Sequence, residues 1–172
     1  MGYTGGTLDN PTYQVLGDHT ESVQMDYDSS VLSYEELLDS FFAFHNPYAE
    51  SFSEQYKSAI FYATEDQKLL AEEKKAAIEE QTGNTVYTEI LPLKTFYLAE
   101  DYHQKYYLRN VPLLAQELDE KYPTIEAFLN APSATRINGY VFGCGTLEGL
   151  MEDLPSFDLS SEAEELLKGM VE

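Results

Sequence analysis

The order of strand-like and helix-like segments between residues 21 and 91 is the feature that most constrains the fold of this chain. Residues 21–28 alternate apolar and polar side chains, which predicts a half-buried strand. Ser33 and Glu36 then form a capping box, and apolar residues recur after it at helical spacing. Asn46-Pro47 ends this predicted helix, because the residue before a proline disfavours the helical conformation.

The next part of the chain repeats the same order of elements. Residues 57–62 are typical of a short strand, and Thr64 with Gln67 predicts the start of a second helix that Gly83 closes. Residues 85–91 alternate again and predict a third strand. Strands that alternate with helices predict an α/β or α+β sandwich, and we expect the α+β form, in which a sheet and its helices make two layers.

Beyond the third strand the sequence is helical in pattern. The helical segments are expected at residues 99–109 and 112–122, with shorter ones near 124–130 and 160–171. No repeat, low-complexity tract or linker separates them from the rest. We therefore expect an α+β domain over residues 1–110 and a helical C-terminal extension over 111–172 that packs on it.

Charge and cysteine content exclude several classes of function. The 31 acidic and 10 basic residues give a net charge of -21, which repels nucleic-acid phosphates and anionic membranes. No apolar run approaches the roughly 20 residues that span a bilayer, and no signal peptide is visible. The single cysteine, Cys144, excludes an internal disulfide and a cysteine-rich zinc site, which favours an intracellular, cytoplasmic location.

No motif for a metal, a cofactor or a hydrolase is present. His45 and His103 are interpreted as structural histidines, because the sequence has no His-Glu-x-x-His or comparable ligand spacing. The glycines near the N-terminus lack the Lys-Ser/Thr of a phosphate-binding loop, and no Gly-x-Ser-x-Gly occurs. We expect no cofactor and no metal.

A series of short segments resembles, in order and spacing, the family of A-type peptide methionine sulfoxide reductases. The resemblance covers residues 1–110, and Arg136–Tyr140 resembles extensions in a eukaryotic-looking branch of the family. The matching segments are Gly2-Tyr3-Thr4-Gly5-Gly6, Asn10-Pro11-Thr12-Tyr13, His19-Thr20-Glu21, Tyr27-Asp28, Ser33-Tyr34, Leu37-Leu38, Phe41-Phe42, His45-Asn46-Pro47, Gln55-Tyr56-Lys57-Ser58-Ala59-Ile60, Thr88-Glu89-Ile90 and 96–104.

The resemblance implies a reaction and roles for three residues. The family reduces the S epimer of methionine sulfoxide, free or in proteins: a cysteine thiolate attacks the sulfur and becomes a sulfenic acid, which a second thiol resolves before thioredoxin reduces the disulfide. On the matching positions Glu21 is the acid, and Tyr13 and Tyr56 donate their hydroxyls to the sulfoxide oxygen. The implied fold is a ferredoxin-like core with a mixed sheet.

This chain departs from the family pattern at the segment that bears the nucleophile. The family's Gly-Cys-Phe-Trp stretch lies upstream of the Gly-Tyr-Thr-Gly-Gly segment, at which this chain begins. We therefore expect a fold truncated by one strand and one helix, and a weak or inactive chain. Two interpretations stay open: a truncated record of an active reductase, or a non-catalytic binding or interaction remnant.

The candidate residues also have structural interpretations. Cys144 lies between Gly143 and Gly145 and is either a resolving or substitute thiol or an inert, partly buried cysteine, and the inert reading is preferred. Glu21 outside the resemblance is an ordinary carboxylate at the start of a strand. Tyr13 and Tyr56 are two of 14 tyrosines and could equally pack in the core.

Overall fold

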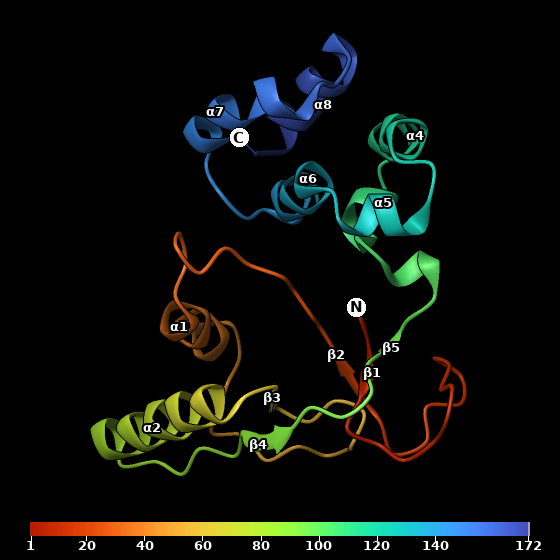
Figure 1. The fold of residues 1–172 in the computed structure, drawn as a ribbon. Coiled ribbons are helices and arrows are strands. Elements are labelled where there is room, and N and C mark those ends of the chain that lie inside the picture. Colours follow the sequence, from red (N-terminus) through yellow and green to blue (C-terminus); the bar gives the residue numbers. More distant parts are fainter. Residues whose placement is uncertain (172) are drawn as a thin grey trace. The chain divides into compact units, whose positions relative to one another are not determined.

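The computed structural model describes residues 1–171 and has an α+β fold (Figure 1). Its contacts divide the chain into two compact units, Met1–Ala99 and Glu100–Glu172. All five strands of the described residues lie in the first unit, and the second unit is helical. No helix among residues 1–171 has both the length and the apolar character needed to span a lipid bilayer.

The first unit contains a small antiparallel sheet that holds the N-terminal segment. Strand β1 (Gly2–Thr4) is central and pairs with β2 (Thr20–Ser22) on one side and β5 (Tyr97–Leu98) on the other. Tyr3 of β1 lies opposite Glu21 of β2, and its side chain is 1% exposed. This register fixes the backbone of Glu21 against a buried strand.

A parallel strand pair and two helices form the rest of the first unit. Strand β3 (Ala59–Tyr62) pairs with β4 (Glu89–Pro92), and helix α2 (Glu65–Thr82) packs against β3 and against α1 (Tyr34–Phe44) (Figure 1). The strands thus form two separate sheets, one antiparallel and one parallel, where the sequence indicated one mixed sheet. The buried side chains of this core are Leu38, Phe42, Ile60, Ala71 and Val86.

The helix caps follow the sequence signals. The capping box of Ser33 and Glu36 is formed at α1, and the Thr64 hydroxyl accepts the N–H of Gln67 at α2. Gly83 ends α2 with φ of 69°, a left-handed conformation that a residue without Cβ adopts at little cost. The predicted starts of these two helices and the predicted end of α2 are confirmed.

The predicted strand over residues 21–28 is wrong beyond Ser22. Val23, Met25 and Tyr27 alternate with polar residues, yet their side chains are 69, 62 and 36% exposed. Alternation produces a strand only where a partner strand supplies backbone hydrogen bonds, and β1 pairs with residues 20–22 alone. The third predicted strand is likewise shorter, since β4 begins at Glu89.

The second unit consists of short helices around a core of their own (Figure 1). The elements are a 3₁₀ turn (Asp101–His103), α3 (Tyr106–Arg109), α4 (Pro112–Lys121), α5 (Ile125–Leu129), α6 (Pro132–Phe142), α7 (Leu147–Phe157) and α8 (Ser161–Val171). A continuous helix over 99–109 was expected and is wrong, because Lys105 adopts φ of 51° and separates the 3₁₀ turn from α3. The predicted boundary at 110/111 lies inside this second unit.

Candidate functional site

The outer edge of β2 is hydrogen-bonded to an irregular segment that precedes β3. The N–H of Glu21 donates to the carbonyl oxygen of Gln55 at 3.0 Å, and the hydroxyl of Thr20 donates to the carbonyl oxygen of Glu54 at 2.9 Å. Glu21 is half-buried, whereas Thr20 is buried. These two bonds hold Gln55 and the residue that follows it beside the Glu21 carboxylate.

The side-chain amide of Gln55 joins two of the predicted site residues. Its Nε2 donates to Oε1 of Glu21 at 2.6 Å and to the hydroxyl oxygen of Tyr56 at 3.0 Å. An amide nitrogen carries two protons, so one group can serve both acceptors at once. Gln55 therefore sets the position of the Glu21 carboxylate relative to the Tyr56 phenol.

Tyr13 completes the hydrogen-bonded set from a different loop. Thr12 and Val15 exchange backbone hydrogen bonds of 3.1 and 3.0 Å, which places Tyr13 in the turn between them. A side-chain hydrogen bond with Tyr13 is the main cause that raises the pKa of Tyr56 above its ordinary value, with burial and the charge of Glu21 adding to it. Both rings remain accessible, with Tyr13 42% and Tyr56 52% exposed.

The structure thus brings Tyr13, Glu21 and Tyr56 together. Gln55, to which the sequence interpretation gave no role, links Glu21 to Tyr56, and Tyr13 is hydrogen-bonded to Tyr56. Gln55 appears in the motif Gln55-Tyr56-Lys57-Ser58, but nothing in its spacing showed that its amide faces β2. The sequence feature that could have indicated a role for Gln55 is its position directly before Tyr56. We call Tyr13, Glu21, Gln55 and Tyr56 the tyrosine–carboxylate site.

The loop that carries Tyr13 is tied down at its base by His19 and Asp18. The N–H of Gly6 donates to Nδ1 of His19 at 3.2 Å, so Nε2 carries the ring proton and donates to the carbonyl oxygen of Leu8 at 2.8 Å. The N–H of Thr7 donates to Asp18 at 2.7 Å, and this bond is the first cause that lowers the pKa of Asp18. The loop therefore starts from a fixed base.

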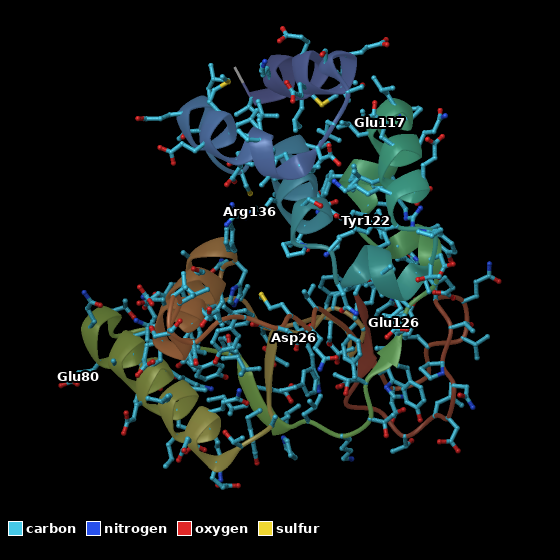
Figure 2. The ribbon with its side chains drawn as sticks, turned by 45° about the horizontal axis from the view of Figure 1, so that its top comes forward. Asp26, Glu80, Glu117, Tyr122, Glu126 and Arg136 are labelled. Carbon is cyan, nitrogen blue, oxygen red and sulfur yellow. The ribbon has the colours of Figure 1, made fainter. Side chains whose placement is uncertain are left out.

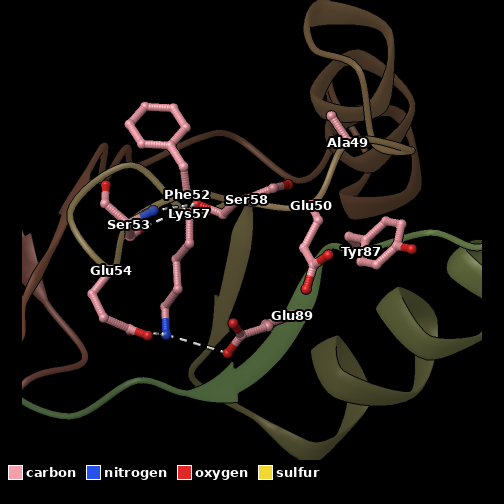
Figure 3. A pocket seen from close by; sticks show the side chains of 10 residues that line it. Ala49, Glu50, Phe52, Ser53, Glu54, Lys57, Ser58, Tyr87 and Glu89 are labelled. Carbon is pink, nitrogen blue, oxygen red and sulfur yellow. Dashed lines mark hydrogen bonds and ion pairs between the residues drawn. The ribbon is translucent and has the colours of Figure 1, made fainter.

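A cavity of about 440 Å³ lies beside the same irregular segment (Figure 3). It is lined by residues 49–54 with Lys57, Ser58, Tyr87 and Glu89. Figure 3 shows the ammonium of Lys57 between Glu54 and Glu89, at 2.9 and 3.2 Å from their carboxylates. Burial works to lower the pKa of Lys57, but its hydrogen bonds to the two carboxylates outweigh burial and raise it.

His45 belongs to a structural hydrogen-bond network. Its Nδ1 lies 2.7 Å from the carbonyl oxygen of Phe41, and its Nε2 lies 2.8 Å from the hydroxyl of Ser58. Ser58 also lies 2.8 Å from the hydroxyl of buried Thr88. Among residues 1–171, no three His, Cys, Asp or Glu side chains are grouped so that they could hold a metal ion.

The comparisons with known proteins identify the family. The model of the family described as "Peptide methionine sulfoxide reductase" matches residues 1–131, which includes the whole tyrosine–carboxylate site. The chain belongs to the peptide methionine sulfoxide reductase family. The recognition made from the short motifs is confirmed.

Relatives of the reductase family align with different shares of the chain. Peptide methionine sulfoxide reductase MsrA of Pasteurella multocida is 43% identical over 118 residues, covering 63% of this chain and 68% of that protein. The Drosophila melanogaster peptide methionine sulfoxide reductase is 37% identical over 162 residues, covering 93% of this chain and 65% of that protein. The chain therefore spans about two thirds of the length of these relatives.

A solved structure supports the reductase fold. The crystal structure of Mxr1 from Saccharomyces cerevisiae in reduced form superimposes with a TM-score of 0.56 at 29% identity, covering 64% of this chain and 69% of that chain. The Drosophila alignment, by its length, also reaches well beyond residue 131, the end of the family match. That alignment therefore includes most of the residues of the second unit.

Cys144 lies in the second unit, whereas the tyrosine–carboxylate site of this reductase-family chain lies in the first. It follows Gly143, which has φ of 93°, in the loop between α6 and α7, and its N–H donates to the carbonyl oxygen of Gly139 at 2.9 Å. The expectation that Cys144 is partly buried is wrong, because it is exposed.

The Arg136–Tyr140 segment has a structural role in the second unit. Figure 2 shows Arg136 on α6, and its guanidinium pairs with Asp153 of α7. The hydroxyl of Tyr140 donates to the same carboxylate at 2.9 Å. Elsewhere in this unit Glu117 accepts the N–H of Ser160 at 2.9 Å (Figure 2). The bonds of Arg136 and Tyr140 to Asp153 join α6 to α7.

Proposed function

We propose that Tyr13, Glu21, Gln55 and Tyr56 form the oxygen-binding side of a methionine sulfoxide site, and that the reaction this site serves is reduction of methionine S-sulfoxide, free or in proteins. The observation that carries the proposal is the Gln55 amide that donates to both Glu21 and Tyr56. This amide joins Glu21 of β2 and Tyr56 of the segment before β3 in one hydrogen-bonded set.

The chemistry of the sulfoxide group fits this set. The oxygen of a sulfoxide is strongly polarised, so phenol hydroxyls of Tyr13 and Tyr56 can donate to it without reacting. A tyrosine keeps its phenol proton at neutral pH, and the pKa of Tyr56 is raised further from that range by its hydrogen bond with Tyr13. In its protonated form, Glu21 is the acid from which the oxygen gains a proton as the S–O bond breaks, and this step leaves Glu21 as the carboxylate.

The balanced reaction needs two thiols in addition to this site. A thiolate attacks the sulfur, takes over the oxygen as a sulfenic acid and releases the methionine sulfide. A second thiol then condenses with the sulfenic acid, forming a disulfide and releasing water. We propose thioredoxin as the reductant of that disulfide, by resemblance to the family.

The 172 residues contain a single thiol, Cys144. A small dithiol can resolve a sulfenic acid in place of a second protein thiol, so turnover with such a reductant needs only one protein nucleophile. We expect weak or absent turnover because the 172 residues contain no match to the family's nucleophilic Gly-Cys-Phe-Trp segment. The alternative function is a protein that binds methionine sulfoxide, or a partner, without reducing it. That alternative is favoured by the thiol count, since Cys144 is the one thiol among the 172 residues.

Turnover and binding separate these functions. Methionine S-sulfoxide peptide is incubated with the 172-residue chain and dithiothreitol, and methionine formation is compared between the wild type and Cys144→Ser. We expect low formation in both. Rapid formation that Cys144→Ser abolishes would show that Cys144 is the nucleophile and would overturn the expectation.

Calorimetric binding of the same peptide then tests the site itself. We expect Tyr56→Phe to weaken binding about fivefold, since it removes one hydrogen bond to the ligand. Tyr106→Phe is the matched control, because Tyr106 is 55% exposed and lies in the second unit. Equal affinities of Tyr56→Phe and wild type would exclude Tyr56 from the site.

A further inference from the structure

The cavity beside Tyr56 has a charge that its own lysine does not neutralise. Three carboxylates line it, those of Glu50, Glu54 and Glu89, against the one ammonium of Lys57. Lys57 is already paired with Glu54 and Glu89. Figure 3 shows the carboxylate of Glu50 directed into the same cavity, and no hydrogen bond or ion pair joins it to the residues that the structure describes.

Aromatic rings on the cavity wall suit a cationic side chain. Phe52 is 89% exposed and Tyr87 is 44% exposed, although both are large and partly apolar. Exposed aromatic faces next to carboxylates attract ammonium and guanidinium groups through cation–π and ionic interactions together. The apolar stem of a lysine or arginine can lie along such rings while its charged end reaches the carboxylates.

The cavity shares no residue with the tyrosine–carboxylate site but adjoins it through Phe52 and Lys57. Lys57 directly follows Tyr56 in the chain, and the ring of Phe52 lies 6.2 Å from the ring of Tyr56. A peptide whose sulfoxide oxygen contacts Tyr56 would therefore carry its neighbouring residues toward Phe52. A flanking side chain, rather than the methionine itself, is the group that this cavity is placed to receive.

We propose that this cavity is a specificity subsite for a lysine or arginine next to the methionine sulfoxide of a peptide substrate. The proposal rests on the proposed function of the tyrosine–carboxylate site. Glu50 supplies the carboxylate with no partner of its own, Glu89 adds a second, and the ring of Tyr87 lies beside Glu50 (Figure 3). The chain then selects basic segments of oxidised proteins over neutral or acidic ones.

Paired peptides test the preference. Calorimetry compares a pentapeptide with lysine on both sides of methionine S-sulfoxide with one that has glutamine at these two places. We expect the lysine peptide to bind about fivefold more tightly at low salt, with the difference shrinking at high salt. Equal affinities would contradict the subsite and leave the proposed function standing.

The net charge of -21 attracts any cation, so the test needs variants of equal charge. We expect Glu50→Gln with Glu89→Gln to abolish the lysine preference. Glu72→Gln with Glu80→Gln removes the same charge from exposed positions on α2, where Figure 2 shows Glu80, and retains the preference. A preference that survives the first pair of changes would show a general charge effect and overturn the proposal.

Two further outcomes keep the inference separate from the function on which it rests. Glu89→Gln removes an ion pair with Lys57, so the single variant Glu50→Gln is measured as well. Glu50→Gln breaks no bond in the first unit, and we expect it to reduce the lysine preference by itself. If neither sulfoxide peptide binds while circular dichroism shows a folded chain, the proposed function fails and the subsite fails with it.

Discussion

At the scale of single residues, the motif predicted which side chains meet but not how they are held. The His19-Thr20-Glu21 segment and the Tyr56 segment were recognised from the sequence, and the structure places Glu21 and Tyr56 within reach of one amide. The role of Gln55 could not be predicted, because it depends on a backbone bond between β2 and a segment 34 residues away.

Replacing Gln55 tests whether it organises the site. In Gln55→Glu a carboxylate takes the place of the donor, so it faces the Glu21 carboxylate and repels it. We expect sulfoxide peptide affinity to fall about tenfold, from loss of the two hydrogen bonds that the Gln55 amide donates and from a new repulsion. Gln24→Glu makes the same charge change at an exposed position and should leave affinity unchanged. Equal affinities for both variants would exclude an organising role.

The hydrogen bond between the two phenols makes a pH prediction. This bond favours the protonated form of Tyr56 in the folded chain. The stabilisation of the fold by this bond is therefore complete below pH 10, the ordinary pKa of tyrosine, and is lost as pH rises through the raised pKa of Tyr56. We expect Tyr13→Phe to lower the pKa of Tyr56 toward the ordinary value of 10.0. A pH titration monitored by ¹³C NMR of labelled tyrosines measures this pKa. Tyr106→Phe should leave it unchanged. An unaltered titration in Tyr13→Phe would show that the two phenols are not coupled.

At the scale of elements, local signals predicted the helices better than the strands. The capping box at Ser33 and the C-cap at Gly83 each form within a single helical turn. Their hydrogen-bond partners lie within a few residues in the sequence, so the sequence alone predicts these caps. Strands depend on partner strands that are distant in the chain. The alternating residues after Ser22 are paired with no strand among the residues that the structure describes. The break at Lys105 had no glycine or proline to signal it.

Removal of the α1 cap tests the contribution of these local signals. Ser33→Ala deletes the hydroxyl that accepts the Glu36 N–H at 3.2 Å. We expect a loss of about 1 kcal/mol in the free energy of unfolding, measured with urea. Ser29→Ala, in the exposed turn before the helix, should change stability by less than about 0.5 kcal/mol. A cost in Ser29→Ala as large as in Ser33→Ala would contradict the assignment.

At the scale of the whole molecule, the expected extension has a core of its own. Thirteen buried residues from α3 to α8 form one cluster, which includes Phe157 and Leu118, both 0% exposed. The sequence indicated helices here but not that they would enclose a core, because each is short and the pattern of one helix does not show its partners. The family match, which ends at residue 131, stops within this cluster.

Truncation of one core residue tests that second core. Phe157→Ala leaves a cavity among buried side chains, and we expect it to cost about 3–5 kcal/mol in the free energy of unfolding. Phe142→Ala is the control, since Phe142 is 54% exposed and should cost less than about 1 kcal/mol. Urea unfolding followed by circular dichroism measures both. Similar small costs would show that residues 100–171 do not pack as described.

The most direct measurement of the tyrosine–carboxylate site is an NMR titration of the 172-residue chain with N-acetylmethionine S-sulfoxide, with the R epimer as the control ligand. We predict that the S epimer shifts the amide signals of Tyr13, Glu21, Gln55 and Tyr56 in a saturable manner, and that the R epimer shifts them much less. Equal shifts for both epimers, or saturable shifts confined to other residues, would contradict the assignment of these four residues to sulfoxide binding.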